Sequence, residues 1–207
     1  MSNMSGQLEG AITETEDLSE IETRLVGLEE GKYDKGKRIL ELGSLGIQDW
    51  PNESVIAAEE MVEKYGMPEC QNRTMLIWRN NGPWLHTIVH STPWRHDWPA
   101  PHLDVLEQAI PYDVPLDRYS DLAQFDGAVF AERTRGILAA RCHKENMNIL
   151  ALNLAHEIAT GKRTWQSARA EYVKTVKRVF ADQTPEYTKE LKFKVPSASG
   201  DPDKAVI

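Results

Sequence analysis

Cysteine is scarce in this chain, since only Cys70 and Cys142 occur among 207 residues. Neither has a second thiol nearby, which excludes a disulfide framework and a CxxC-type zinc or redox motif. Such cysteine usage is typical of thiols that stay reduced. We therefore expect a cytoplasmic protein.

Long apolar runs are also missing. No window approaches the roughly eighteen uninterrupted apolar residues that a membrane-spanning helix needs. Residues 1–15 contain neither a basic start nor the apolar run of a secretory signal. The sequence predicts that this protein neither spans a membrane nor binds one.

The chain has no excess of positive charge. Its formal net charge is −8, and the first thirty residues contain eight carboxylates against Arg24 alone. The remaining residues are close to neutral and offer no broad basic surface for a phosphate backbone. Nucleic acid is therefore not an expected partner.

Several catalytic signatures are absent from the sequence. It contains no phosphate-binding loop, no G-x-G-x-x-G, no G-x-S-x-G, no H-E-x-x-H and no EF-hand loop. These absences exclude the enzyme classes that such motifs mark, and they favour a binding or assembly role.

The composition of the rest is that of a globular protein, with 41% hydrophobic and 27% charged residues. We expect residues 1–45 to form a disordered or weakly helical acidic arm, because apolar residues are few and Gly27, Gly31 and Gly36 interrupt the helical pattern. Residues 46–184 are predicted to form a single α+β domain. The polar residues 185–207 are predicted to be a flexible tail.

Apolar periodicity predicts the elements of that domain. A helix is expected at 52–65 with Asn52 as its N-cap, and the Asn81-Gly82 pair is expected to turn a hairpin. The proline-rich residues 91–101 are predicted to form an ordered loop. Further elements are a strand at 102–114, a short helix at 115–125, a second hairpin over 128–142, and helices at 144–160 and from 165 to 180.

These elements predict an α+β fold. It would be a mostly antiparallel sheet of two hairpins plus a strand, packed on helices that include a C-terminal αα-hairpin. Because folds of this kind host many functions, the function must be argued from a site.

A tryptophan-rich stretch is the first candidate site. Trp84, Trp94, Arg95 and Trp98 are of the residue types enriched at binding hot spots. We expect them, together with the acidic arm, to engage a protein partner or a second copy of the chain.

A histidine cluster is the second candidate. His102-Leu103-Asp104 places two potential ligands on one face of a strand, and His96 and His156 are the further ligands that we expect. The set would hold iron or zinc. The corresponding function is a metal-dependent enzyme that acts on a small organic molecule.

Two other interpretations fit the same residues. In the first, the tryptophan-rich loop packs over a sheet edge, and backbone carbonyls satisfy the histidine nitrogens. Alternatively, Cys142 would be a thiolate nucleophile with His143 as its base, provided that the strand ends between them, because neighbouring residues on a strand point to opposite faces.

Overall fold

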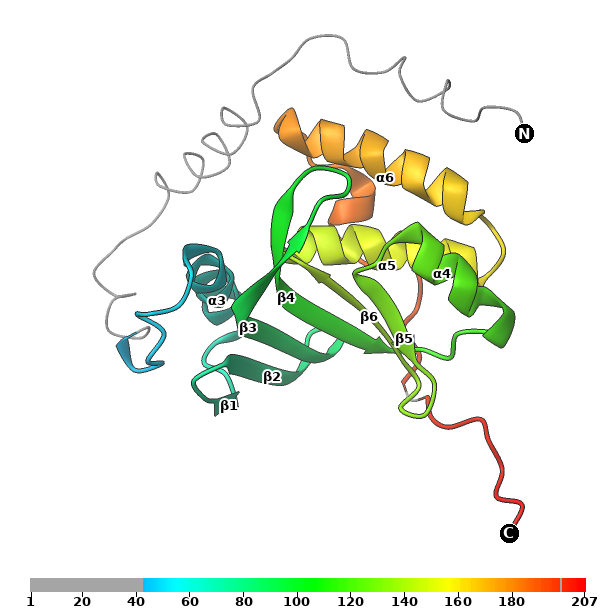
Figure 1. Cartoon of the computed structure of the whole chain (residues 1–207), viewed down its shortest axis with the longest axis horizontal. Coiled ribbons are helices and arrows are strands. Elements are labelled where there is room, and N and C mark those ends of the chain that lie inside the picture. Colours follow the sequence, from blue (N-terminus) through cyan, green and yellow to red (C-terminus); the bar gives the residue numbers. More distant parts are fainter. Residues whose placement is uncertain (1–42, 198) are drawn as a thin grey trace, which may run out of the picture. The chain divides into compact units, whose positions relative to one another are not determined.

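A computed structural model describes residues 43–197 and 199–207, so the predicted acidic arm lies almost wholly outside the described residues. Figure 1 shows a sheet with helices packed against it. The helices are α3 (Asn52–Tyr65), α4 (Tyr119–Phe125), α5 (Glu145–Ala159) and α6 (Trp165–Phe180), with 3-10 turns η1 (Leu116–Arg118) and η2 (Glu186–Thr188). The strands are β1 (Cys70–Gln71), β2 (Met75–Asn81), β3 (Trp84–His96), β4 (His102–Pro111), β5 (Val129–Glu132) and β6 (Ile137–Cys142).

The strands form one antiparallel sheet of order β1-β2-β3-β4-β6-β5. This confirms the α+β prediction, including both hairpins, the strand between them and the C-terminal helix pair α5 and α6. The short edge strand β1 was not predicted, because two residues are too few to show a period.

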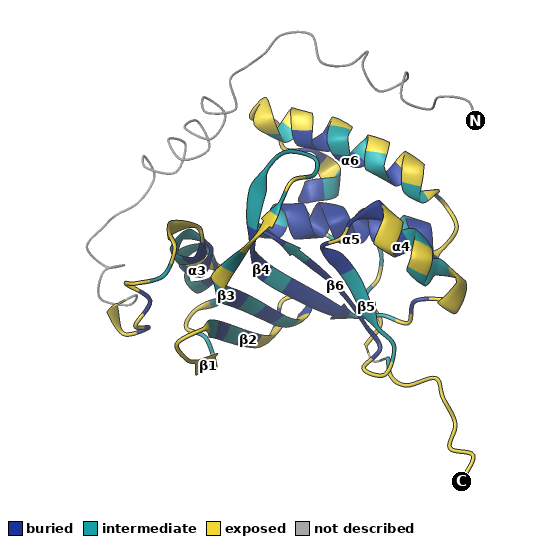
Figure 2. Ribbon diagram, viewed as in Figure 1, coloured by how far each residue is buried: buried dark blue, intermediate teal, exposed yellow. Residues whose placement is uncertain are grey.

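Helices α3 and α5 cover the same face of the sheet. On β4, Gln108 contacts Met61 of α3 and Glu145 of α5, while Leu106 and Ile110 are fully buried on the same side. Figure 2 shows α5 buried along most of its length and α6 exposed on its outer side. The continuous apolar pattern of α5 therefore reflects a helix enclosed between the sheet and α6.

Strand β3 corrects the prediction of a loop at residues 91–101. It runs through Pro93 to His96, and its pairing with β4 shifts register between Val89 and Trp94. Such a bulge accommodates a proline, which cannot donate to the ladder. Only residues 97–101 form the loop between β3 and β4.

Two local details of the α3–β3 region also differ from expectation. Asn52 is the first residue of α3, and Pro51 occupies the N-cap position without a side-chain hydrogen bond. Asn81 pairs with Trp84 inside the β2–β3 ladder, so Gly82 and Pro83 form the turn. Gly82 has a φ of +69°, a conformation that glycine adopts without a steric penalty.

The segment after Pro185 contacts the core, although its polar composition indicated a loose tail. Asn153 of α5 is 2% exposed, and its side-chain amide donates to the carbonyls of Tyr187 and Glu190. Its oxygen accepts from the Lys192 backbone N–H at 2.7 Å. Phe193 and Val195 then pack against the main core, so one buried amide fastens this segment to α5.

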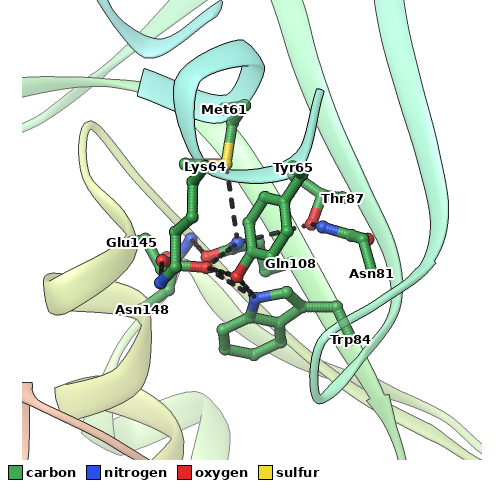
Figure 3. A network of polar contacts seen from close by, with 9 residues as sticks. All are labelled: Met61, Lys64, Tyr65, Asn81, Trp84, Thr87, Gln108, Glu145 and Asn148. Carbon is green, nitrogen blue, oxygen red and sulfur yellow. Dashed lines mark hydrogen bonds and ion pairs between the residues drawn. The ribbon is translucent and has the colours of Figure 1, made fainter. Parts of the chain in front are cut away.

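A polar network is buried between α3, the sheet and α5 (Figure 3). At its centre, Glu145 Oε1 accepts from Tyr65 Oη at 2.6 Å, Trp84 Nε1 at 2.6 Å and Gln108 Nε2 at 2.8 Å. Glu145 Oε2 pairs with Lys64. Burial would raise the pKa of Glu145, but Lys64 and the other donors hold it below its usual value. A single carboxylate thus links four elements of the fold.

The opposite face of the sheet carries a second ionic group. Glu107 lies 3.3 Å from His86 Nε2, 3.6 Å from His90 Nε2 and 3.7 Å from Arg141 Nε. The Arg141 guanidinium also lies over the Phe130 ring at 4.8 Å. His86 and His90, which are four residues apart on one strand, therefore meet at the same carboxylate.

Glu107 predicts a pH dependence of stability. Burial would raise its pKa, but the two histidines lower it from 4.5 to about 2. Because the folded-state pKa is depressed, the stabilisation is complete above about pH 4.5 and is lost as the pH falls towards 2. We expect Glu107→Gln to cost about 1–3 kcal/mol at pH 7 and almost nothing at pH 2. Urea unfolding of both proteins across this range measures the difference, and a constant difference would contradict the prediction.

Among the described residues, no helix combines the length and apolar character that crossing a membrane requires.

Candidate functional site

The register of the sheet assembles the histidine cluster. His102 and Asp104 alternate onto the helix-covered face of β4, and His96 on β3 pairs directly with His102. The predicted H-x-D geometry is therefore present. The third member of the group comes from the neighbouring strand.

Strand β6 brings two further groups to the same place. Cys142 pairs with Leu106, two positions beyond Asp104 on β4, and it is buried on the same face. Strand β6 ends at Cys142, so His143 lies outside the strand alternation and turns back towards the thiol. The Cys142 sulfur lies 3.4 Å from His102 Nε2 and 3.4 Å from His143 Nδ1.

The His102 ring is oriented by its backbone contact. His102 Nδ1 lies 2.9 Å from the Ala100 carbonyl, so this nitrogen carries the proton and donates it. His102 Nε2 then faces the Asp104 Oδ1 acceptor at 3.1 Å and the Cys142 sulfur at 3.4 Å. The interpretation that backbone carbonyls satisfy the histidines thus accounts for one nitrogen of His102 only.

His96 connects two carboxylates. Its Nδ1 lies 3.3 Å from Asp104 Oδ2, and its Nε2 lies 3.5 Å from Asp126 Oδ1. His96 Nδ1 and Asp104 Oδ1 are nevertheless buried without a hydrogen bond. These two atoms therefore approach their neighbours without the alignment of donor and acceptor that hydrogen bonding requires.

The electrostatics of the cluster are strongly perturbed. Burial would lower the pKa of His102, but its contacts with Asp104 and Cys142 raise it to about 11. Burial would raise the pKa of Cys142, but His143 and His102 lower it to about 6. Burial raises the pKa of Asp126 to about 6 although the Ala128 N–H donates to it. Perturbed groups gathered in this way are typical of functional sites.

Among the residues that the structure describes, two sets of three have ligand atoms close enough to share one metal ion. The first is His96, His102 and Asp104, and the second is His102, Cys142 and His143. The ligand atoms within each set all lie within 4.8 Å of one another. His102 belongs to both sets.

His156, the fourth predicted ligand, belongs to neither set. Its Nδ1 lies 2.9 Å from the Tyr112 hydroxyl, and its ring stacks on Phe193 with centroids 4.1 Å apart. Helix α5 therefore directs His156 into an aromatic contact with the C-terminal segment. The structure does not bring His156 together with His96, His102 and Asp104.

The predicted tryptophan surface is divided in the structure. Trp84 is 2% exposed and belongs to the Glu145 network, so it cannot line a surface. Trp98 is half-buried against Tyr172. Trp94 is 41% exposed, and Arg95 beside it pairs with Asp97 in solvent. A partner contact at Trp94 and Arg95 stays a prediction.

Sequence reasoning underrated Cys142 and did not identify Asp126. The available signal for Cys142 was the end of the strand. The side chain of a histidine directly after a strand need not point to the opposite face of the sheet, so it can reach the thiol. Asp126 follows α4 and carries no local pattern. Only the tertiary structure brings its Oδ1 to within 3.5 Å of His96 Nε2.

Comparison with known proteins finds no family model, no curated relative and no solved structure that matches this chain.

Proposed function

We propose that this protein is a metal-dependent enzyme with a divalent ion, preferably zinc, held by His102, Cys142 and His143. The observation that carries the proposal is the position of the Cys142 sulfur, 3.4 Å from a nitrogen of each histidine. Zinc bonds of about 2.0–2.1 Å to nitrogen and about 2.3 Å to sulfur in a tetrahedral site separate such atoms by about 3.5 Å.

The contacts of His102 support a cation at this point. With Nδ1–H donated to Ala100, Nε2 faces the Asp104 carboxylate and the Cys142 sulfur. A second proton on His102, a hydrogen bond from the Cys142 S–H or a metal ion would balance this arrangement. Ligating histidines commonly donate their other ring nitrogen to a backbone carbonyl, as His102 does.

The thiolate favours zinc over iron. Cysteine and imidazole together suit zinc, whereas His96, His102 and Asp104 form the two-histidine, one-carboxylate set that is typical of non-haem iron. Cys142 is 4% exposed beside the shared His102. The alternative assignment is an iron enzyme whose metal is bound by His96, His102 and Asp104. In that enzyme Cys142 would not be a ligand.

The proposed reaction is hydrolysis of a small organic molecule. Three protein ligands leave one coordination position on zinc, which supplies Lewis-acid chemistry or an activated water when bound. Asp104 Oδ1 lies 3.1 Å from Nε2 of the ligand His102, and His96 links Asp104 to Asp126. A carboxylate in contact with an imidazole, as Asp104 is with His96, is suited to accept a proton and pass it on. The His96 side chain is 19% exposed and offers contact with solvent.

Elemental analysis of untagged protein, purified from cells supplied with zinc and iron, tests this function. We expect close to one zinc per chain in the wild type and the same content in His156→Ala, because His156 lies in a different contact. Cys142→Ser should lose the zinc. Wild-type protein without stoichiometric metal would refute the proposal. Iron that remains bound in Cys142→Ser would instead assign the metal site to His96, His102 and Asp104.

A further inference from the structure

The loop at residues 97–101 bears on the proposed metal site because it supplies the carbonyl that orients His102. Ala100 O accepts from His102 Nδ1 at 2.9 Å. The side chain of Trp98, two residues before Ala100 in the same loop, packs on α6. Its ring centroid lies 4.9 Å from that of Tyr172. The loop is thus attached to a helix that contributes no ligand to either set.

Arg169 completes this attachment. Its guanidinium carbon lies 4.0 Å from the centroid of the Trp98 ring, a close cation–π contact. Arg169 Nη1 also donates to the Phe125 carbonyl at 2.9 Å. Phe125 is fully buried against Trp98 and Tyr172, and it directly precedes Asp126. One arginine therefore fastens both the loop before His102 and the end of α4 before Asp126.

We propose that Trp98, which contacts both Tyr172 and Arg169, is a positioning residue that fixes the Ala100 carbonyl and through it the His102 imidazole. This inference rests on the proposed function insofar as His102 is a metal ligand. Helix α6 holds Trp98, and Trp98 holds the loop that contains Ala100. The Ala100 carbonyl in turn orients the His102 ring, whose Nε2 faces Cys142. No part of it requires Trp98 to touch the metal.

Zinc affinity, measured by competition with a chelator, tests the positioning role. We expect Trp98→Ala to weaken zinc binding about 10- to 100-fold, which is the typical loss of affinity when an outer-shell partner of a metal ligand is substituted. Trp98→Phe keeps an aromatic ring at this position and should have a zinc affinity within about threefold of the wild type, given its weaker cation–π contact with Arg169. Wild-type affinity in Trp98→Ala would overturn the proposal.

A second readout separates positioning from general destabilisation and needs no metal. In wild-type protein the His102 Nδ1 proton should be observable by NMR and protected from exchange with solvent, because Ala100 accepts it. Trp98→Ala should lose that protected proton while the Glu145 network keeps its own protected Trp84 indole proton. If the wild type binds no zinc but this pattern is found, the metal proposal fails and the positioning role stands. A protected His102 proton in Trp98→Ala refutes the positioning role itself.

Discussion

His102→Ala is expected to abolish stoichiometric metal binding. His102 is the one residue common to both sets of candidate ligands, so its loss leaves two ligands in each. We expect the affinity for zinc to fall by more than the roughly 100-fold that outer-shell substitutions cost. Chelator competition measures the dissociation constant, and elemental analysis measures the content.

Variants of the other ligands distinguish the two sets. If zinc is bound by His102, Cys142 and His143, Cys142→Ser should weaken binding nearly as much as His102→Ala, whereas His96→Ala should weaken it less. If His96, His102 and Asp104 hold the ion, the order of Cys142→Ser and His96→Ala reverses. Equal zinc contents in wild type and His102→Ala would contradict both assignments.

The same variants also affect stability. A ligand that binds only the folded protein stabilises it by about 4 kcal/mol when present at a thousand times its dissociation constant. Zinc should therefore raise the unfolding midpoint of the wild type and leave that of His102→Ala unchanged. This comparison separates loss of the metal from loss of the fold, since the metal-free proteins serve as each other's reference.

Glu145→Ala is expected to have the largest effect on folding. The carboxylate accepts hydrogen bonds from Trp84, which is 2% exposed, and from Gln108, which is fully buried. Leaving buried donors without an acceptor costs about 1–3 kcal/mol each. Trp84 keeps a 3.1 Å contact with Tyr65, and Gln108 keeps a 3.3 Å contact with Thr87, which soften the loss. We expect the free energy of unfolding to fall by about 3 kcal/mol.

Two control variants resolve the sources of that effect. Glu145→Gln retains an oxygen acceptor for Trp84 and Tyr65, and should cost clearly less than Glu145→Ala. Lys64→Met removes only an ion-pair partner whose side chain is 54% exposed, and should cost about 1 kcal/mol or less. Denaturant unfolding with the midpoint as readout ranks the three. If Lys64→Met were as destabilising as Glu145→Ala, the ion pair rather than the buried donors would hold the network.

Local patterns were sufficient for most of the elements. The 3.6-residue period of α5 and α6, the Thr164 side chain that accepts from the Ser167 N–H, and Gly161 between them specify a helix pair without tertiary information. The alternation of His102 and Asp104 likewise depends only on the period of a strand. These features follow from backbone geometry, which nearby residues control.

The partners of those residues were decided by the tertiary structure. His96 faces His102 because β3 continues past Pro93 through a bulge, and Cys142 joins them because β6 pairs with β4 in one particular register. A shift of one residue would turn Cys142 to the other face. His156 illustrates the converse, since its helix was predicted correctly but its side chain meets Phe193. The sequence by itself determined which residue types are present and which local elements carry them, whereas strand register and packing decided which ligand atoms converge, because contacts between distant segments depend on the whole folded chain.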